Sequence, residues 1–285
     1  MREHWVEVNG VGLRVITAGP VNGSPLVFLH GFPETAALSW RHQLDWFVAK
    51  GYRAIAIDQR GYNCSGKPRR VTDYRLELLA EDVIGAIRAL GHERVTVVGH
   101  DWGAAVAWCL ADRHVSVVRR AIILNCPHGV AFKHTLLHNP RQWLLSWYIL
   151  FFQLPWLPER ALAWNNFFWL RRALRTSAHP GTFAAADLAQ YTDAWRQPDA
   201  LRSMLNWYRG LVRYPVMLDP SRKITIPVLM LWGKQDCFLL ADMAEASIEM
   251  CENGRLIYLP EASHWLQHEK PEEVNPLIHD FLQAG

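Results

Sequence analysis

Long hydrophobic runs are missing from this sequence. The longest apolar stretch covers residues 143–157, and Ser146, Gln153 and Pro155 interrupt it. A membrane-spanning helix needs a run of about 18 or more apolar residues, so the sequence predicts no membrane span. Residues 1–9 alternate charged and apolar side chains and lack the hydrophobic segment of a secretory leader. Both absences favour a protein of the cytoplasm.

Cysteine is also scarce. The five cysteines are scattered, odd in number and without the spacing that is typical of metal ligands. In a chain of 285 residues this pattern predicts reduced thiols in a cytoplasmic protein and no metal site. An excess of one charge is missing as well, because the net charge is only +3, which does not indicate a nucleic-acid partner.

Apolar residues make up half of the chain, which is enough for one large core. Short β-branched runs alternate with helical patterns in the first 125 residues and again after residue 226, as is typical of an α/β fold with a mostly parallel sheet. We expect helices near residues 76–90, 241–250 and 272–282, and Gly91 suits the end of the first. The expected strands cover residues 13–17, 25–30, 53–58, 95–99, 121–124, 227–232 and 256–259.

The pattern changes between these two regions, where strand-like runs vanish and helical periodicity takes over. Residues 128–220 hold seven of the 14 tryptophans, and residues 129–220 hold ten Lys and Arg against five Asp and Glu. We therefore predict a first part of an α/β core at residues 1–128, an inserted helical lid at 129–220 and a second part of the core at 221–285. Arg171, Arg172 and Arg175 fit either a solvated helix face or, together with exposed aromatic residues, a dimer or membrane-surface patch.

The strongest chemical signal is a Gly-His-Asp-Trp-Gly segment at residues 99–103, between an expected strand and a helical pattern. Two glycines permit a turn too tight for side chains, so that the central residue stands exposed at the carboxyl edge of the sheet. This residue is Asp101, and the partial positive charge at the start of the next helix favours its ionised, nucleophilic form. Aspartate is also a common helix N-cap, so the segment alone leaves a structural role open.

A second glycine-containing loop, His-Gly-Phe-Pro-Glu at residues 30–34, follows another expected strand. Backbone N–H groups in such a loop can stabilise a developing oxyanion. If Asp101 is the nucleophile, the expected donors are the N–H groups of Phe32 and Trp102. An ordinary strand-to-loop turn is the alternative.

Two further residues complete a charge system. Asp236 follows the expected strand at 227–232, and His264 follows the last expected strand. A nucleophile, then an acid, then a histidine, each in a loop after a strand, is the chain order of α/β-hydrolases. Asn125 also follows a strand but is not an acid, so Asp236 is the predicted partner of His264.

Together these elements make the chain resemble the α/β-hydrolase superfamily over nearly its whole length and, within it, the soluble epoxide hydrolases of bacterial type. Such enzymes carry two lid tyrosines whose hydroxyls bind the epoxide oxygen. One precedes a Phe-Gln-x-Pro segment, found here at residues 152–155 after Tyr148, and the other lies in an Asn-Trp-Tyr-Arg segment, found here at 206–209 with Tyr208. The resemblance implies an α/β-hydrolase fold and a substrate site formed by Tyr148, Tyr208, Phe32 and Trp102.

The resemblance also implies a reaction that needs no metal or other cofactor. Asp101 attacks an epoxide carbon and forms an alkyl-enzyme ester, and His264, oriented by Asp236, activates the water that releases a vicinal diol. The apolar, tryptophan-rich lid favours apolar or aromatic epoxides. The expected partners are this small-molecule substrate and water, and the chain is expected to be a monomer or a homodimer.

Two alternatives remain at this point. A haloalkane or haloacetate dehalogenase uses the same aspartyl ester, but haloacetate enzymes have an arginine where this chain has Trp102. Haloalkane enzymes usually have an asparagine or a second tryptophan as halide donor, and the position where we look for the asparagine holds Phe32. A non-catalytic binding protein on this fold usually lacks the nucleophile, the acid or the histidine, and this chain has all three. A serine esterase is not expected, because Asp101 occupies the nucleophile position.

Overall fold

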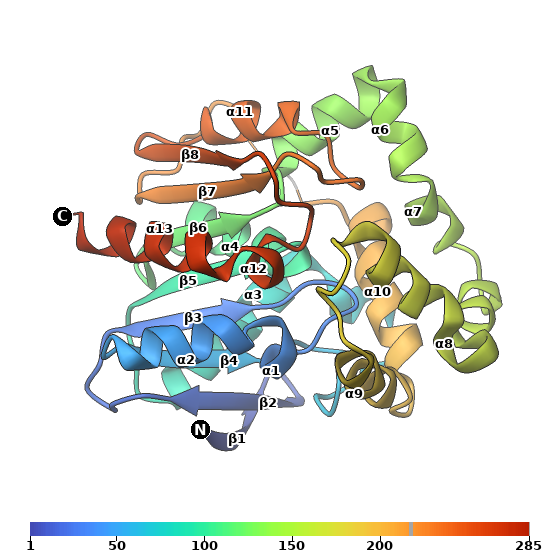
Figure 1. Cartoon of the computed structure of the whole chain (residues 1–285), viewed down its shortest axis with the longest axis horizontal. Coiled ribbons are helices and arrows are strands. Elements are labelled where there is room, and N and C mark those ends of the chain that lie inside the picture. Colours follow the sequence, from blue (N-terminus) through green and yellow to red (C-terminus); the bar gives the residue numbers. More distant parts are fainter. Residues whose placement is uncertain (217–218, 285) are drawn as a thin grey trace.

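One mixed β-sheet organises the chain (Figure 1), and the computed structural model describes residues 1–216 and 219–284. Within these residues, eight strands lie in the order β1-β2-β4-β3-β5-β6-β7-β8. β2 pairs antiparallel with β1 and β4, and all other neighbours pair parallel. The strands are β1 (Arg2–Val8), β2 (Val11–Ala18), β3 (Pro25–Leu29), β4 (Arg53–Ile57), β5 (Val95–His100), β6 (Val118–Leu124), β7 (Val228–Gly233) and β8 (Gly254–Leu259).

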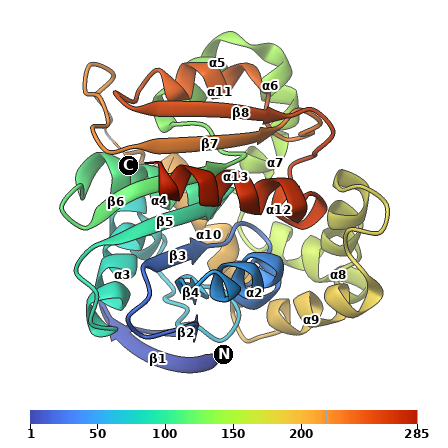
Figure 2. The same ribbon diagram turned by 60° about the vertical axis from the view of Figure 1, so that its left-hand side comes forward.

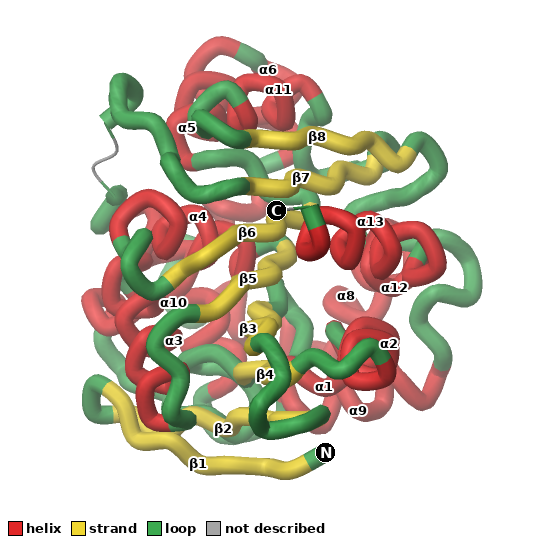
Figure 3. The backbone as a smooth tube through the Cα atoms, turned by 90° about the vertical axis from the view of Figure 1, so that its left-hand side faces the viewer, coloured by secondary structure: helices red, strands yellow, loops and turns green. Residues whose placement is uncertain are grey.

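Helices cover both faces of this sheet (Figures 2 and 3). Side chains alternate in direction along a strand, so Val27 and Val97 join the core with α3 and α4, whereas Phe28 and Val98 join the core with α2 and α13. Burial on both faces explains why the central strands are nearly continuous apolar runs. These helices are α1 (Ala36–Ser39), α2 (Arg41–Ala49), η1 (Val71–Tyr74), α3 (Leu76–Ala89), α4 (Trp102–Arg113), α11 (Asp242–Ile248), α12 (Leu266–Glu269) and α13 (Pro271–Gln283).

A separate helical layer is inserted between β6 and β7 and lies beyond the carboxyl ends of the parallel strands (Figure 1). Its longest helix, α8, bends sharply because residues 164–167 leave helical backbone angles. The layer falls within the predicted lid at 129–220, of which residues 217–218 lie outside the described part, and the exact segment boundaries stay predictions. Its helices are α5 (Gly129–His138), α6 (Pro140–Leu145), α7 (Trp147–Phe151), α8 (Leu157–Ser177), α9 (Ala185–Trp195) and α10 (Ala200–Arg213).

The expected α/β-hydrolase architecture is confirmed, and the expected strands and helices are found with shifted ends. For example, the strand expected at 121–124 begins at Val118. Sequence reasoning assigned no strand to residues 2–8, and this was wrong, because β1 pairs with β2 along its whole length. Only Val6 and Val8 of this edge strand are buried, so its apolar signal is weak. Among residues 1–216 and 219–284, no helix is long and apolar enough to cross a bilayer.

Candidate active site

Asp101 occupies a strained turn between β5 and α4. Its backbone angles are φ 51° and ψ −120°, which a residue with a side chain rarely adopts and which often marks a functional position. Glycines make the turn possible: a Cβ on Gly103 would lie 2.0 Å from the carbonyl oxygen of Leu29, and one on Gly31 would lie 2.5 Å from the Cβ of Asp101. The carboxylate accepts a hydrogen bond of 2.8 Å from the backbone N–H of Phe32 at its Oδ1.

His264 links this carboxylate to a second one. Its Nδ1 donates to Oδ2 of Asp236 over 2.7 Å, and its Nε2 lies 3.7 Å from Oδ2 of Asp101. The other oxygen of Asp236 accepts hydrogen bonds from the backbone N–H groups of Phe238 and Leu239 at 2.7 and 3.0 Å. The imidazole is therefore held in one orientation, with its free nitrogen turned toward Asp101.

Electrostatics favour an ionised pair at rest. Burial opposes charge on both groups, but the two carboxylates raise the pKa of His264 to about 10. Burial also works against the carboxylate of Asp101, yet the positive charge of His264 3.7 Å away and the hydrogen bond from the N–H of Phe32 hold its pKa below the usual value. At neutral pH the site thus contains a carboxylate on Asp101 and an imidazolium on His264.

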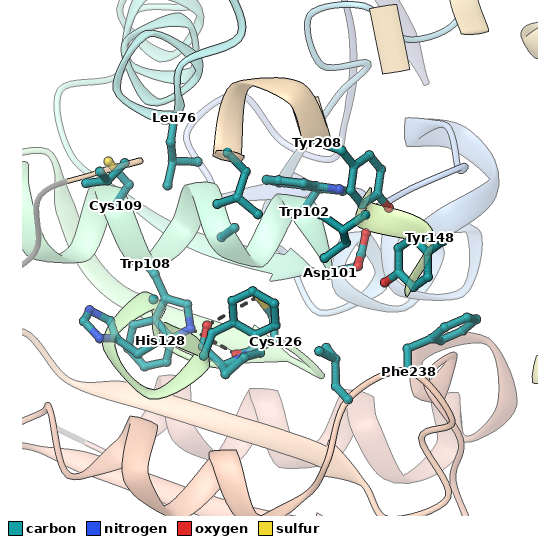
Figure 4. Close-up of a pocket in the computed structure, with 18 residues that line it drawn as sticks. Leu76, Asp101, Trp102, Trp108, Cys109, Cys126, His128, Tyr148, Tyr208 and Phe238 are labelled. Atoms are coloured by element: carbon teal, nitrogen blue, oxygen red, sulfur yellow. Dashed lines mark hydrogen bonds between the residues drawn. The ribbon is translucent and has the colours of Figure 1, made fainter. Parts of the chain in front are cut away.

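Two tyrosines of the helical layer face this carboxylate. Tyr148 lies on α7 and Tyr208 on α10, with ring centres 5.8 Å apart, and Figure 4 shows both hydroxyls on the side of Asp101. The indole of Trp102 packs edge-on against the ring of Tyr208, with ring centres 5.0 Å apart. Burial raises the pKa of both tyrosines, so both are neutral donors.

Two apolar cavities meet at Asp101, Tyr148 and Tyr208, all of which line both. The smaller, of about 130 Å³, runs along α4 past Trp108 (Figure 4). The larger, of about 610 Å³, lies between α6, α7 and α8 and includes Phe32 and His264 in its lining. The structure thus gathers all predicted site residues around one point: Asp101, Asp236, His264, Phe32, Trp102, Tyr148 and Tyr208.

Comparison with known proteins agrees with this geometry. A family model described as alpha/beta hydrolase fold matches residues 24–271. The chain is 44% identical to the AB hydrolase superfamily protein YfhM of Bacillus subtilis, over 98% of this chain and 97% of that protein. It is 38% identical to Epoxide hydrolase 3 of Xenopus tropicalis, over 96% of this chain and 76% of that protein.

A solved structure is also closely similar. It is a mutant epoxide hydrolase from Bacillus megaterium in complex with its product, a naphthyloxy-propane-1,2-diol. The TM-score is 0.88 at 34% sequence identity, and the match covers 99% of this chain and all of that one. The chain belongs to the epoxide hydrolase family of α/β-hydrolases. Among the described residues, no group of three or more His, Cys, Asp or Glu side chains is placed to hold a metal ion.

Asn125 has a role that sequence reasoning missed. Its Nδ2 donates to Oδ2 of Asp236 over 2.6 Å, and its Oδ1 accepts from the N–H of Gly233 over 2.7 Å. Asn125 thereby ties the loop after β6 to the loop after β7 and holds the carboxylate that orients His264. Its position after a strand was visible in the sequence, but we compared it with Asp236 only as a possible partner of His264 and set it aside because it is not an acid.

A buried carboxylate at Glu34 was also missed. Glu34 contacts Nδ1 of His100 at 2.9 Å and Nε2 of His268 at 2.7 Å, and Nε2 of His100 donates to the backbone oxygen of His264 over 2.8 Å. Burial opposes its charge, but the two histidines hold the pKa of Glu34 well below its usual value. Glu34 therefore joins the loop that bears Phe32 to the loop that bears His264.

Arg209 connects the two tyrosine segments. From α10 it donates to the backbone oxygens of Phe152 and Leu154, both over 2.9 Å, and it pairs with Glu159 at 2.7 Å. These contacts link the Tyr-Arg pair of α10 to the Phe-Gln-x-Pro segment, which forms the turn between α7 and α8. The guanidinium thus ties α10, which bears Tyr208, to the turn that follows the Tyr148 helix α7.

We expect an Arg209→Met enzyme to lose both stability and activity. The substitution leaves Glu159 without its partner and several carbonyl groups without a donor, a change worth about 3 kcal/mol of unfolding free energy. Displaced tyrosines should lower kcat/KM for an epoxide by about tenfold to a hundredfold. Thermal denaturation and steady-state kinetics measure both effects, with the exposed Arg213→Met as the matched control on the same helix. An unchanged kcat/KM would show that the tyrosines do not depend on Arg209.

Proposed function

We propose that this protein hydrolyses apolar or aromatic epoxides to vicinal diols through an ester on Asp101. The observation that carries the proposal is the junction of the two cavities, where a carboxylate, a histidine and two neutral tyrosine hydroxyls surround one point. The diol bound to the Bacillus megaterium relative supports the same product class. The apolar cavity walls favour substrates with hydrophobic substituents on the epoxide.

The first half-reaction opens the ring. The Asp101 carboxylate attacks a ring carbon, so that an ester bond forms while the carbon–oxygen bond of the epoxide breaks. The electron pair moves to the epoxide oxygen, where the hydroxyls of Tyr148 and Tyr208 donate hydrogen bonds. The imidazolium of His264 supplies the proton that finally converts this oxygen to a hydroxyl, and His264 ends the step neutral.

Ester formation prepares the second half-reaction. It removes the negative charge of Asp101, one of the charges that raise the pKa of His264. The pKa of His264 therefore falls in the ester, and its neutral form can take a proton from water. The hydroxide adds to the ester carbonyl carbon, and the developing oxyanion faces the N–H of Phe32 and, as second donor, that of Trp102. The intermediate collapses and expels the diol oxygen, which takes the proton of the new carboxyl group, so that Asp101 is again a carboxylate and His264 an imidazolium.

The fate of labelled oxygen tests this scheme. Excess enzyme is mixed with styrene oxide in water labelled with heavy oxygen, so that each active site turns over once. Because water attacks the carbonyl of Asp101, we expect the label in the Asp101 peptide and unlabelled oxygen in the first diol. Mass spectrometry of both measures the outcome. Full labelling of the first diol would mean direct attack by water, and absence of any diol would overturn the proposed activity.

A further inference from the structure

The helical layer exposes an unusual amount of apolar side-chain surface. Trp147 is 62% exposed and Trp156 61%, and they belong to a larger set on α6, α7, α8 and the adjoining turns. Isolated exposed apolar residues are common, but a contiguous set indicates a binding surface. The set, which we name the aromatic face, consists of Trp143, Leu144, Trp147, Leu150, Leu154, Trp156, Leu157, Trp164, Phe168 and Trp169.

Three members of the aromatic face line the larger cavity. They are Leu144 of α6, Trp147 of α7 and Trp169 of α8. Trp164, in the bend of α8, stacks on Trp169 with ring centres 6.5 Å apart. Trp164 therefore lies next to a residue that lines the cavity. Figure 1 shows α6, α7 and α8 following one another along the outer edge of the molecule. The cavity that reaches Asp101 is therefore bordered by exposed tryptophans.

The same segment is strongly basic. Residues 129–177 contain six Lys and Arg but only one acidic residue, Glu159, which pairs with Arg209. Within the described part of the chain, none of these six cations forms an ion pair. Arg160 lies over the ring of Trp156 at 4.9 Å, so that charge and aromatic surface occur together. The six residues are Lys133, Arg141, Arg160, Arg171, Arg172 and Arg175.

We propose that the aromatic face binds the surface of an anionic lipid bilayer. Tryptophan favours the interface between headgroups and hydrocarbon, and unpaired arginines attract anionic headgroups. A second copy of the chain is a poorer occupant, because a symmetric contact would bring the same cations against one another. If the proposed function holds, an apolar epoxide dissolved in the bilayer meets the larger cavity directly at its border.

Vesicle sedimentation of the full chain tests the proposal. We expect binding to vesicles of equal parts phosphatidylglycerol and phosphatidylcholine, and little binding to phosphatidylcholine alone. Arg160→Gln with Arg175→Gln should weaken binding by about fivefold for each charge removed. Trp143→Ser with Trp164→Ser should weaken it by at least about fivefold, because less apolar surface enters the interface. These four residues lie outside the sets that line the two cavities.

The control is Trp5→Ser with Arg119→Gln, which removes an exposed tryptophan and an exposed arginine far from the helical layer and should bind like the unchanged protein. Salt at about 1 M should weaken binding, because the Debye length falls to about 3 Å. No sedimentation with anionic vesicles, or equal losses in control and test variants, would overturn the proposal. The proposal would also be overturned if analytical ultracentrifugation showed that the unchanged protein is a dimer and that the Trp143→Ser with Trp164→Ser variant is a monomer.

Hydrolysis of styrene oxide in buffer is measured for each variant as a separate readout. All variants should retain this activity, which shows that they are folded, while an epoxide presented in anionic vesicles should be hydrolysed more slowly by the test variants than by the control. Equal rates in vesicles would overturn the inferred entry from the bilayer. If neither the unchanged protein nor any variant hydrolyses styrene oxide, the proposed function is contradicted. The sedimentation result then still tests lipid binding, because it does not depend on hydrolysis.

Discussion

A His264→Gln enzyme is expected to open one epoxide per active site and then stop, with the substrate attached to Asp101. Ring opening needs an ionised Asp101 and the donors Tyr148 and Tyr208, and at about pH 8 a carboxyl group without the imidazolium still loses its proton. Solvent can then supply the proton to the opened oxygen. Hydrolysis of the ester has no such substitute, because the glutamine cannot take a proton from water. Loss of this general base should slow hydrolysis by about 10²–10⁴-fold.

Intact-protein mass spectrometry should show this enzyme gaining the mass of one substrate molecule, and digestion should place the adduct on the peptide that contains Asp101. His134→Gln is the matched control, since His134 is exposed on α5 and should leave turnover unchanged without an adduct. Addition of Asp101→Ala to the His264→Gln enzyme should abolish the adduct. Normal turnover by the His264→Gln enzyme, or an adduct on another residue, would contradict the scheme.

The position of the triad could be predicted because it follows from strand order. Asp101, Asp236 and His264 each lie in the turn or loop that follows a parallel strand, and the carboxyl ends of parallel strands meet at one edge of the sheet. Residues separated by more than 160 positions in the chain therefore had to be neighbours once the strands were recognised. The tyrosines were different, because helical periodicity predicts a buried face but not what that face contacts. Tyr148 and Tyr208 came from the resemblance alone.

The polar pairs that hold the site together were not predictable in this way. Glu34 meets His100 and His268 only because a loop, the end of β5 and the short helix α12 converge, and no local sequence pattern predicts such a contact. Asn125 likewise donates a hydrogen bond to Asp236 from the end of the neighbouring strand β6. Propensity and periodicity describe local conformation, whereas the hydrogen-bond partners of Glu34 and Asn125 depend on how distant segments pack together. The same limit explains why the exposed tryptophans of the helical layer could be counted in the sequence but not assigned to one face.

Removal of both tyrosine hydroxyls is expected to nearly abolish epoxide hydrolysis. An alkoxide is a poor leaving group, and the opened oxygen gains its negative charge inside an apolar cavity, where Tyr148 and Tyr208 are the donors that face it. Each single Tyr→Phe change should raise the barrier by about 2–4 kcal/mol, a loss of about thirtyfold to nearly a thousandfold in kcat/KM. Some activity should survive in each, because one donor remains.

The double variant Tyr148→Phe with Tyr208→Phe should also fail to form the ester, which distinguishes it from His264→Gln. Stopped-flow tryptophan fluorescence and intact mass after mixing with styrene oxide measure ester formation directly, apart from hydrolysis. Tyr214→Phe provides the matched control, since Tyr214 caps the C-terminal end of α10 and is 39% exposed. A double variant with a native circular dichroism spectrum and the activity of the unchanged enzyme would show that the epoxide oxygen is stabilised elsewhere, and the roles of both tyrosines would have to be abandoned.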